Sequence, residues 1–131
     1  MALQPSVYAN LLRDKIARHH AQCWLVNTGW IGGPYGVGNR IKIKFTRPMI
    51  RSILNGKLAA VPTRTDPVFG LHIPQVCEDV PSEILWPSTS WKNQADYEAK
   101  ARELAKRFEK NFEAFSPTVS EEVFASGPKI R

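Results

Sequence analysis

The sequence predicts a mixed α/β fold, with short strands between helices and one long amphipathic helix near the end of the chain. The run Cys23 to Val26 is short and almost wholly apolar, as in a strand covered on both faces. Residues 40–45 alternate between cationic and apolar side chains, which is the period of a half-buried strand. From about Gln94 to Phe115, apolar residues recur every three or four positions, which predicts a helix.

Length and composition indicate one soluble unit. A chain of 131 residues, 43% of them hydrophobic, is long enough for one domain and too short for two, so we expect residues 1–131 to form a single unit. No apolar run is long enough to cross a bilayer, and residues 1–13 lack the apolar stretch of a signal peptide. We therefore expect a cytoplasmic protein. Cys23 and Cys77 lie far apart with no metal-ligand spacing, so both are expected to be free thiols.

The first predicted helix begins at Pro5 and closes at His19 and His20. Its apolar side chains fall on one side at helical spacing: Tyr8, Leu11, Leu12 and Ile16. The Cys23–Val26 strand comes next. A loop rich in glycine, residues 29–38, then leads to the second strand.

In the second strand, the alternation puts Ile41, Ile43 and Phe45 on one side and a row of cations on the other. We expect Thr46 to cap the following helix through its hydroxyl, with Pro48 in the first turn. Asn55 and Gly56 predict a left-handed end to that helix. The apolar stripe of the helix is expected to consist of Met49, Ile50, Ile53 and Leu54.

Residues 58–91 carry five prolines, too many for a helix or a central strand, so this segment is expected to run mostly extended over a surface. The long helix that follows is predicted to start at an Asn93 cap, with Asp96 in its first turn. Two ion pairs four residues apart are expected along it, Glu98 with Arg102 and Glu103 with Arg107. Phe112 and Phe115 are expected in the core, and a short helix is predicted around residues 119–124.

The formal net charge of +6 favours an anionic ligand. Because the basic residues are spread along the chain, a small phosphorylated or carboxylated ligand explains this charge better than nucleic acid does. Gly33 to Gly38 has the glycine spacing of a phosphate-binding P-loop. However, Asn39 and Arg40 occupy the positions where that motif has Lys and Ser or Thr.

The residues of this loop allow two interpretations. Its glycines either only permit tight turns or form a backbone that closes over a ligand, with Arg40 and Thr46 as donors. Trp30 and Tyr35 either stack on a base or sugar or pack against their own domain.

Three motifs in order carry a resemblance to a known family. NTGWIGGPYGVGNRIKIKFTR at residues 27–47, DPVFGLHIP at residues 66–74 and VPSEILWP at residues 80–87 resemble ATP-dependent phosphoenolpyruvate carboxykinase. The likeness covers essentially the whole chain. Members of the family are several times longer, so the chain resembles only their C-terminal portion. The implied fold is part of the C-terminal lobe of that enzyme, a single partial domain.

The resemblance implies a function in gluconeogenesis, the conversion of oxaloacetate and ATP to phosphoenolpyruvate, CO2 and ADP. Arg40, Ile41 and Thr46 fall on the nucleotide-contacting positions of the family, so this chain would supply the nucleoside side of the ATP site. The P-loop of the family, the ligands of its Mg2+ or Mn2+ and its substrate-binding arginines belong to the N-terminal portion. We therefore assign no catalytic residue and no metal ligand here, and expect the isolated chain to be inactive.

The implied partners are ATP, oxaloacetate and the missing N-terminal portion of the enzyme, with no nucleic acid and no membrane. The alternative is a stand-alone truncated module that binds adenine nucleotides or another protein without catalysis. Two departures from the family pattern stand out: Asn39 replaces a frequent Lys, and WPST at residues 86–89 replaces an Asn-Pro-Arg-Asn-like turn. Since few strands are present to cover Cys23–Val26, we also expect exposed apolar surface and marginal stability.

Overall fold

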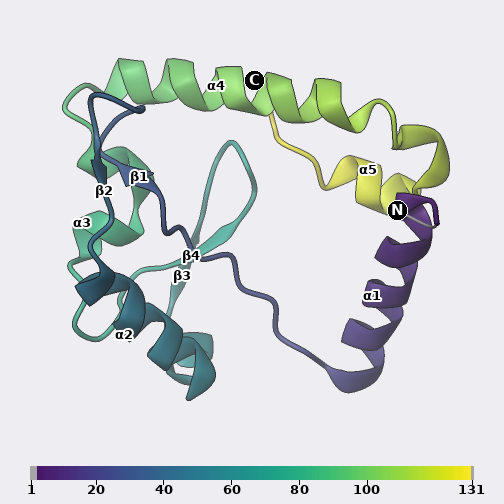
Figure 1. Cartoon of the computed structure of the whole chain (residues 1–131), viewed down its shortest axis with the longest axis horizontal. Helices are drawn as coiled ribbons and strands as arrows, with labels where there is room; N and C mark the ends of the chain where they lie inside the picture. The colour runs from purple at the N-terminus through teal and green to yellow at the C-terminus, as the bar shows by residue number, and fades with distance from the viewer. Residues whose placement is uncertain (1–2, 131) are drawn as a thin grey trace.

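The computed structural model describes residues 3–130 and is dominated by helices. Figure 1 shows α4 (Gln94–Phe112) along one side of the molecule, with α1 (Pro5–His19) and α2 (Ile43–Leu54) on opposite sides below it. Two further α-helices are short, α3 (Ser82–Leu85) and α5 (Glu121–Ala125). Single 3-10 turns complete the helical part: η1 (Lys57–Ala60), η2 (Pro87–Ser90) and η3 (Ser116–Thr118).

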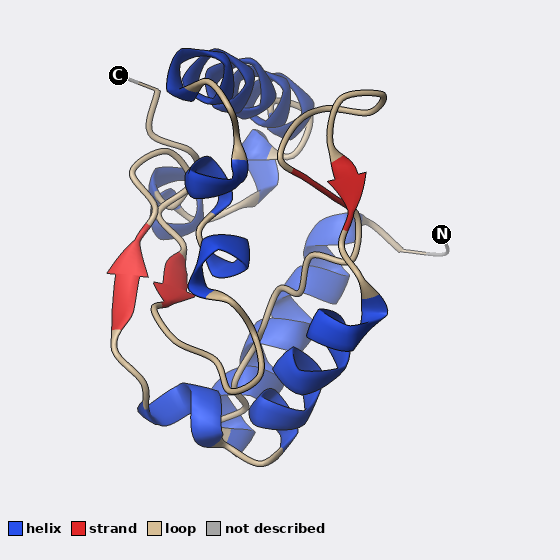
Figure 2. Cartoon of the chain, turned by 90° about the vertical axis from the view of Figure 1, so that its left-hand side faces the viewer, coloured by secondary structure: helices blue, strands red, loops and turns tan. Residues whose placement is uncertain are grey.

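The strands form two separate antiparallel pairs (Figure 2). In the first pair, β1 (Trp30–Ile31) lies against β2 (Asn39–Arg40), with Trp30 opposite Arg40. In the second pair, β3 (Thr63–Thr65) lies against β4 (His72–Pro74). The mixed α/β class is therefore confirmed, with strands of only two or three residues.

The predicted strand at Cys23–Val26 is wrong. These residues have no regular structure, Cys23 is exposed and the Leu25 side chain is 85% exposed. Trp24 alone packs against the core cluster. A strand needs a neighbour for its backbone N–H and C=O groups, and none of the strands among residues 3–130 pairs with this segment. The two thiols are free, as expected, and Cys77 is buried.

The second predicted strand is also wrong beyond its first residue. β2 ends at Arg40 and α2 begins at Ile43, which is 66% exposed and not on a buried strand face. Lys42, not Thr46, is the N-cap residue, and Pro48 lies inside the helix. The helix prevails because it places Phe45 and two later side chains, each four residues further on, on one face against the core: Phe45, Met49 and Ile53.

The core lies where α2 meets the proline-rich segment. Leu58, Cys77 and Val80 are buried together, and seven partly buried side chains pack against them. Residues 58–91 were expected to run mostly extended over a surface, and most of them are exposed or half-buried, but this segment also supplies the buried centre and four short elements. The seven packing residues are Trp24, Phe45, Met49, Ile53, Val61, Ile84 and Leu85.

The long helix is confirmed in position and N-terminal cap. The Asn93 side chain accepts a hydrogen bond from the Ala95 N–H at 2.9 Å, and α4 ends at Phe112, three residues before the predicted end. Of the two predicted ion pairs, Glu103 with Arg107 forms, whereas Glu98 accepts a hydrogen bond from Gln94 at 3.3 Å and makes no ion pair with Arg102. Buried residues on α4 are Ala101 and Ala105 alone, and the predicted core residues Phe112 and Phe115 are half-buried.

The remaining helices agree with expectation in position. α1 ends at His19 with left-handed backbone at His20, Gly56 has left-handed backbone just after α2, and α5 lies close to the predicted tail helix. No residue of α1 is buried, so the apolar side of this helix faces solvent. The most extensive contacts between elements join neighbours along the chain: β1 with β2, α2 with η1, β3 with β4, α3 with η2, and η2 with α4.

Candidate functional site

The glycine-rich loop forms a tight hairpin between β1 and β2. Its closest approach is at Gly38, where a Cβ would lie 2.5 Å from the carbonyl oxygens of Ile31 and Gly33. The Gly38 and Val37 N–H groups both donate to the Pro34 carbonyl, at 2.9 and 3.0 Å. Because any side chain at position 38 meets fixed backbone, this glycine is needed for the hairpin to close.

The hairpin also contacts a distant part of the chain. Gly32 has a φ of +78°, and a Cβ there would lie 3.1 Å from the Ser90 carbonyl oxygen of η2. Thus the loop is held against the segment that precedes α4. At the tip, the rings of Trp30 and Tyr35 pack edge to face at 5.0 Å between centroids, although Tyr35 remains 84% exposed. These rings therefore pack on each other, one of the two roles considered for them.

Arg40, Ile41 and Thr46 lie along the stretch that runs from the end of β2 into the start of α2. Arg40 ends β2 with an exposed side chain, and Ile41 is buried, with its N–H donating to the Gly29 carbonyl at 2.8 Å. Thr46 is half-buried in the first turn of α2, and its N–H donates to Lys42 at 3.4 Å. Here an exposed guanidinium and a half-buried hydroxyl lie near a residue anchored in the interior.

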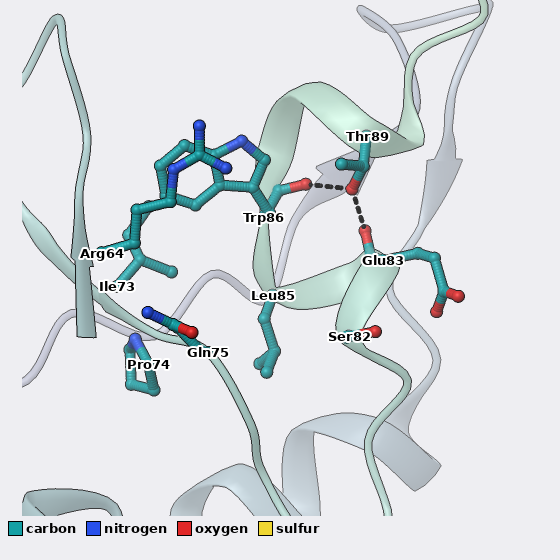
Figure 3. Close-up of a pocket in the computed structure, with 9 residues that line it drawn as sticks. All are labelled: Arg64, Ile73, Pro74, Gln75, Ser82, Glu83, Leu85, Trp86 and Thr89. Carbon is teal, nitrogen blue, oxygen red and sulfur yellow. Dashed lines mark hydrogen bonds between the residues drawn. The ribbon is translucent and has the colours of Figure 1, made fainter. Parts of the chain in front are cut away.

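A first cavity of about 290 Å3 lies elsewhere, between the β3–β4 hairpin and α3 (Figure 3). In it, the Arg64 guanidinium carbon lies 4.1 Å from the centre of the Trp86 ring, a cation–π contact. The Thr89 hydroxyl donates toward the carbonyls of Trp86 at 2.7 Å and of Glu83 at 3.0 Å. The WPST turn lacks the arginine of the Asn-Pro-Arg-Asn-like turn that it replaces, but the Arg64 guanidinium of β3 contacts it.

Sequence reasoning missed this pair because no local pattern links Arg64 to Trp86. The two residues lie on separate elements, and only the fold of the proline-rich segment brings them together. The one available signal was the unusual Trp at the turn.

A second cavity, of about 240 Å3, lies between the turn after β3 and α4 and is largely apolar. Asp66 is buried at its edge, where its Oδ1 accepts the N–H groups of Val68 at 2.9 Å and Phe69 at 2.6 Å. Tyr97 lines the same cavity, and its pKa is raised by burial first and by the Asp66 charge second. Neither of these two cavities is lined by Arg40, Ile41 or Thr46.

A divalent metal finds no ready site in the part of the chain that the structure describes. Among residues 3–130, no three His, Cys, Asp or Glu side chains gather closely enough to hold an ion. These residues therefore do not fit that cofactor by themselves. Within the same residues, no helix has both the length and the apolar character needed to cross a membrane.

The fold and the hairpin together define a mixed α/β chain in which the exposed Arg40 follows a glycine-rich turn. A family profile described as phosphoenolpyruvate carboxykinase matches residues 1–83. A relative from Geotalea uraniireducens, named phosphoenolpyruvate carboxykinase (ATP), is 54% identical over 94% of the chain. Relatives of the same name from Alkaliphilus oremlandii and Bradyrhizobium diazoefficiens are each 47% identical over the full chain. The chain belongs to the ATP-dependent phosphoenolpyruvate carboxykinase family.

The chain is much shorter than these relatives. It covers 23% of the Geotalea protein, 25% of the Alkaliphilus protein and 24% of the Bradyrhizobium protein. It therefore corresponds to about a quarter of a carboxykinase polypeptide.

Proposed function

We propose that this chain supplies the nucleoside side of the ATP site of a phosphoenolpyruvate carboxykinase, as a single partial domain of that enzyme. The complete enzyme would convert oxaloacetate and ATP to phosphoenolpyruvate, CO2 and ADP, in the cytoplasm and in gluconeogenesis. The observation that carries the proposal is the position of Arg40, exposed and directly before the buried Ile41. The exposed Arg40 guanidinium ends the second strand of a hairpin in which a side chain at Gly38 would meet fixed backbone.

The proposed contribution is positional. Ile41 is buried and its N–H bonds to Gly29 at 2.8 Å, so the backbone that carries Arg40 is fixed before ligand arrives. A guanidinium makes charge-assisted hydrogen bonds, and the Thr46 hydroxyl adds a neutral donor one turn into α2. Holding ATP in this way would place its γ-phosphate for transfer, which is a proximity effect and not proton transfer. A divalent metal and the chemical step belong to the rest of the enzyme, so the isolated chain is proposed to be inactive.

The test is ATP binding by a chimera in which this chain replaces the matching quarter of the Geotalea relative. Charged hydrogen bonds contribute about 1.5–3 kcal/mol, so Arg40→Ala is expected to weaken ATP binding about tenfold to a hundredfold. Thr46→Val, which keeps the shape and removes the hydroxyl, should weaken it about twofold to tenfold. Isothermal titration calorimetry measures both.

The matched control is Arg18→Ala, which removes the same charge from the exposed end of α1 and should leave the affinity unchanged. Equal ATP affinities for the parent chimera, Arg40→Ala and Thr46→Val would remove these residues from the site. Turnover of oxaloacetate by the 131-residue chain alone would contradict its proposed role as a part of the enzyme.

A further inference from the structure

Helix α2 has a second apolar face that nothing in the described structure covers. Ile43, Ile50 and Leu54 are 66%, 43% and 82% exposed. They recur at spacings of seven and four residues, so they lie along one side of the helix. We call this side the outer face of α2.

The outer face is distinct from the side of α2 that packs on the core. Phe45, Met49 and Ile53 already contact the cluster around Leu58, so this inner side accounts for the packing of α2 within the chain. A surface helix normally carries one apolar stripe, whereas a helix that is apolar on two sides is normally covered on both. The outer face therefore has the character of an interface.

The charges around the outer face indicate what kind of partner surface it would bind. Arg47 lies within the outer face at helical spacing from Ile43 and Ile50, with Lys44 and Arg51 beside it, and all three cations are exposed. Residues 15–65 contain nine Lys and Arg and no Asp or Glu, whereas residues 66–131 contain eight Lys and Arg and eleven Asp and Glu. The basic residues occur in both ranges, whereas acidic residues are absent from residues 15–65. A partner for the outer face must bring carboxylates of its own.

The amount of exposed surface indicates a large partner. The chain exposes 10179 Å2, whereas a compact monomer of 14.8 kDa exposes about 7,000 Å2. The excess of about 3,000 Å2 is larger than the roughly 800 Å2 that each partner contributes to a standard interface. Since the relatives are about four times as long as the part this chain matches, their remaining three quarters can supply a cover of this size.

We propose that the outer face of α2 docks into an apolar groove with an acidic rim on the remaining three quarters of the carboxykinase polypeptide. This proposal rests on the proposed function and specifies the partner of the same site. Thr46 lies four residues before Ile50 and therefore beside it on the helix surface. Docking would thus shield the Thr46 side of α2 and complete the wall of the nucleotide site between the two portions.

The test is a cysteine footprint at Leu54. Leu54→Cys is introduced together with Cys23→Ser, because Cys23 is exposed whereas Cys77 is buried. A maleimide should label Cys-substituted position 54 rapidly in the 131-residue chain and at least tenfold more slowly in the Geotalea chimera. Unfolding the chimera in urea should restore the rapid rate. Adding Arg47→Glu and Arg51→Glu should remove the protection, whereas Arg47→Lys and Arg51→Lys should retain it.

Equal labelling rates in the chimera and in the isolated chain would overturn the proposal. Protection that arises in the isolated chain and grows with its concentration would also overturn it, since the occupant would then be a second copy. If the chimera does not fold, a cysteine at the aligned position of the intact Geotalea relative gives the same comparison. The two proposals can fail separately. Protection of position 54 with an ATP affinity that does not depend on Arg40 would support the docking and contradict the nucleotide site. An Arg40-dependent ATP affinity without protection of position 54 would support the nucleotide site and contradict the docking.

Discussion

Tyr97 is placed so that its ionisation opposes folding. It lines the largely apolar cavity beside α4, and burial together with the nearby Asp66 carboxylate raises its pKa above the ordinary value of 10. A raised folded pKa means that the neutral phenol contributes stability that is complete below about pH 10 and is lost as the pH rises through the folded pKa. We expect the chain to lose stability in this alkaline range.

Tyr97→Phe should remove that alkaline loss, and urea unfolding at several pH values would measure it. The ultraviolet absorbance of tyrosinate provides an independent measurement, as the difference between the parent and Tyr97→Phe. Asp66→Asn keeps the oxygen that accepts from Val68 and Phe69 and should lower the Tyr97 pKa only in part, because burial is the larger cause. Titration of Tyr97 at the ordinary pKa of a tyrosine, about 10, would contradict the expectation.

Closure of the β1–β2 hairpin depends on Gly38. In Gly38→Ala the new methyl group meets two backbone oxygens at 2.5 Å, so the hairpin must shift. Overpacking of this kind costs about 1–3 kcal/mol, and thermal unfolding followed by circular dichroism should show the lower transition. The control is Gly36→Asn, since Gly36 has left-handed backbone and open space around it, and Asn tolerates that conformation. Equal losses in the two variants would show that the close approach at Gly38 is not limiting.

Among the elements, α4 depends on a single side-chain cap. The Asn93 Oδ1 accepts the Ala95 N–H at 2.9 Å and so satisfies one of the free N–H groups at the start of this 19-residue helix. Replacing such a cap with Ala costs about 1 kcal/mol. We expect Asn93→Ala to lower the urea midpoint accordingly, with Asn93→Ser and Asn93→Asp close to the parent. An unchanged midpoint in Asn93→Ala would mean that water satisfies the N–H equally well.

The helices could be predicted from the sequence because their signals are local. The Asn93 cap, the Asn55–Gly56 end of α2 and the periodicity of α1 each lie within a few residues of the structure they specify. The strands could not be predicted in the same way, since a strand forms only beside a partner. The apolar run at Cys23–Val26 has the composition of a covered strand but pairs with no strand among residues 3–130.

The candidate site shows the same division. The exposure of Arg40 and the burial of Ile41 agree with the alternating pattern, but the pattern fails from Ile43 onward, where α2 has already begun. Thr46 was expected as a helix cap and lies instead inside the first turn. The assignment of all three residues to ATP came from the resemblance, and geometry alone would have led to the Arg64–Trp86 cavity, for which the Trp in the WPST turn was the one sequence signal.

On the scale of the whole molecule, apolar exposure is the dominant feature. Large hydrophobic side chains are exposed on α1, α2, α4 and α5, and no large side chain among the described residues is fully buried. Exposed patches of this kind bind hydrophobic dyes and favour association. We expect strong dye fluorescence with the isolated chain and much weaker fluorescence, per molecule, with the chimera. A cooperative, monomeric thermal transition of the isolated chain without dye binding would contradict this expectation.

The neighbour-to-neighbour contacts described above bear on how the chain folds. Each hairpin or helix pair closes only a short loop, and folding rates rise as the mean sequence separation of contacting residues falls. The elements can therefore assemble quickly from contacts that form within the chain. The core around Leu58, Cys77 and Val80 instead joins residues as far apart in the chain as Trp24 and Leu85, so the speed of assembly and the final stability depend on different contacts.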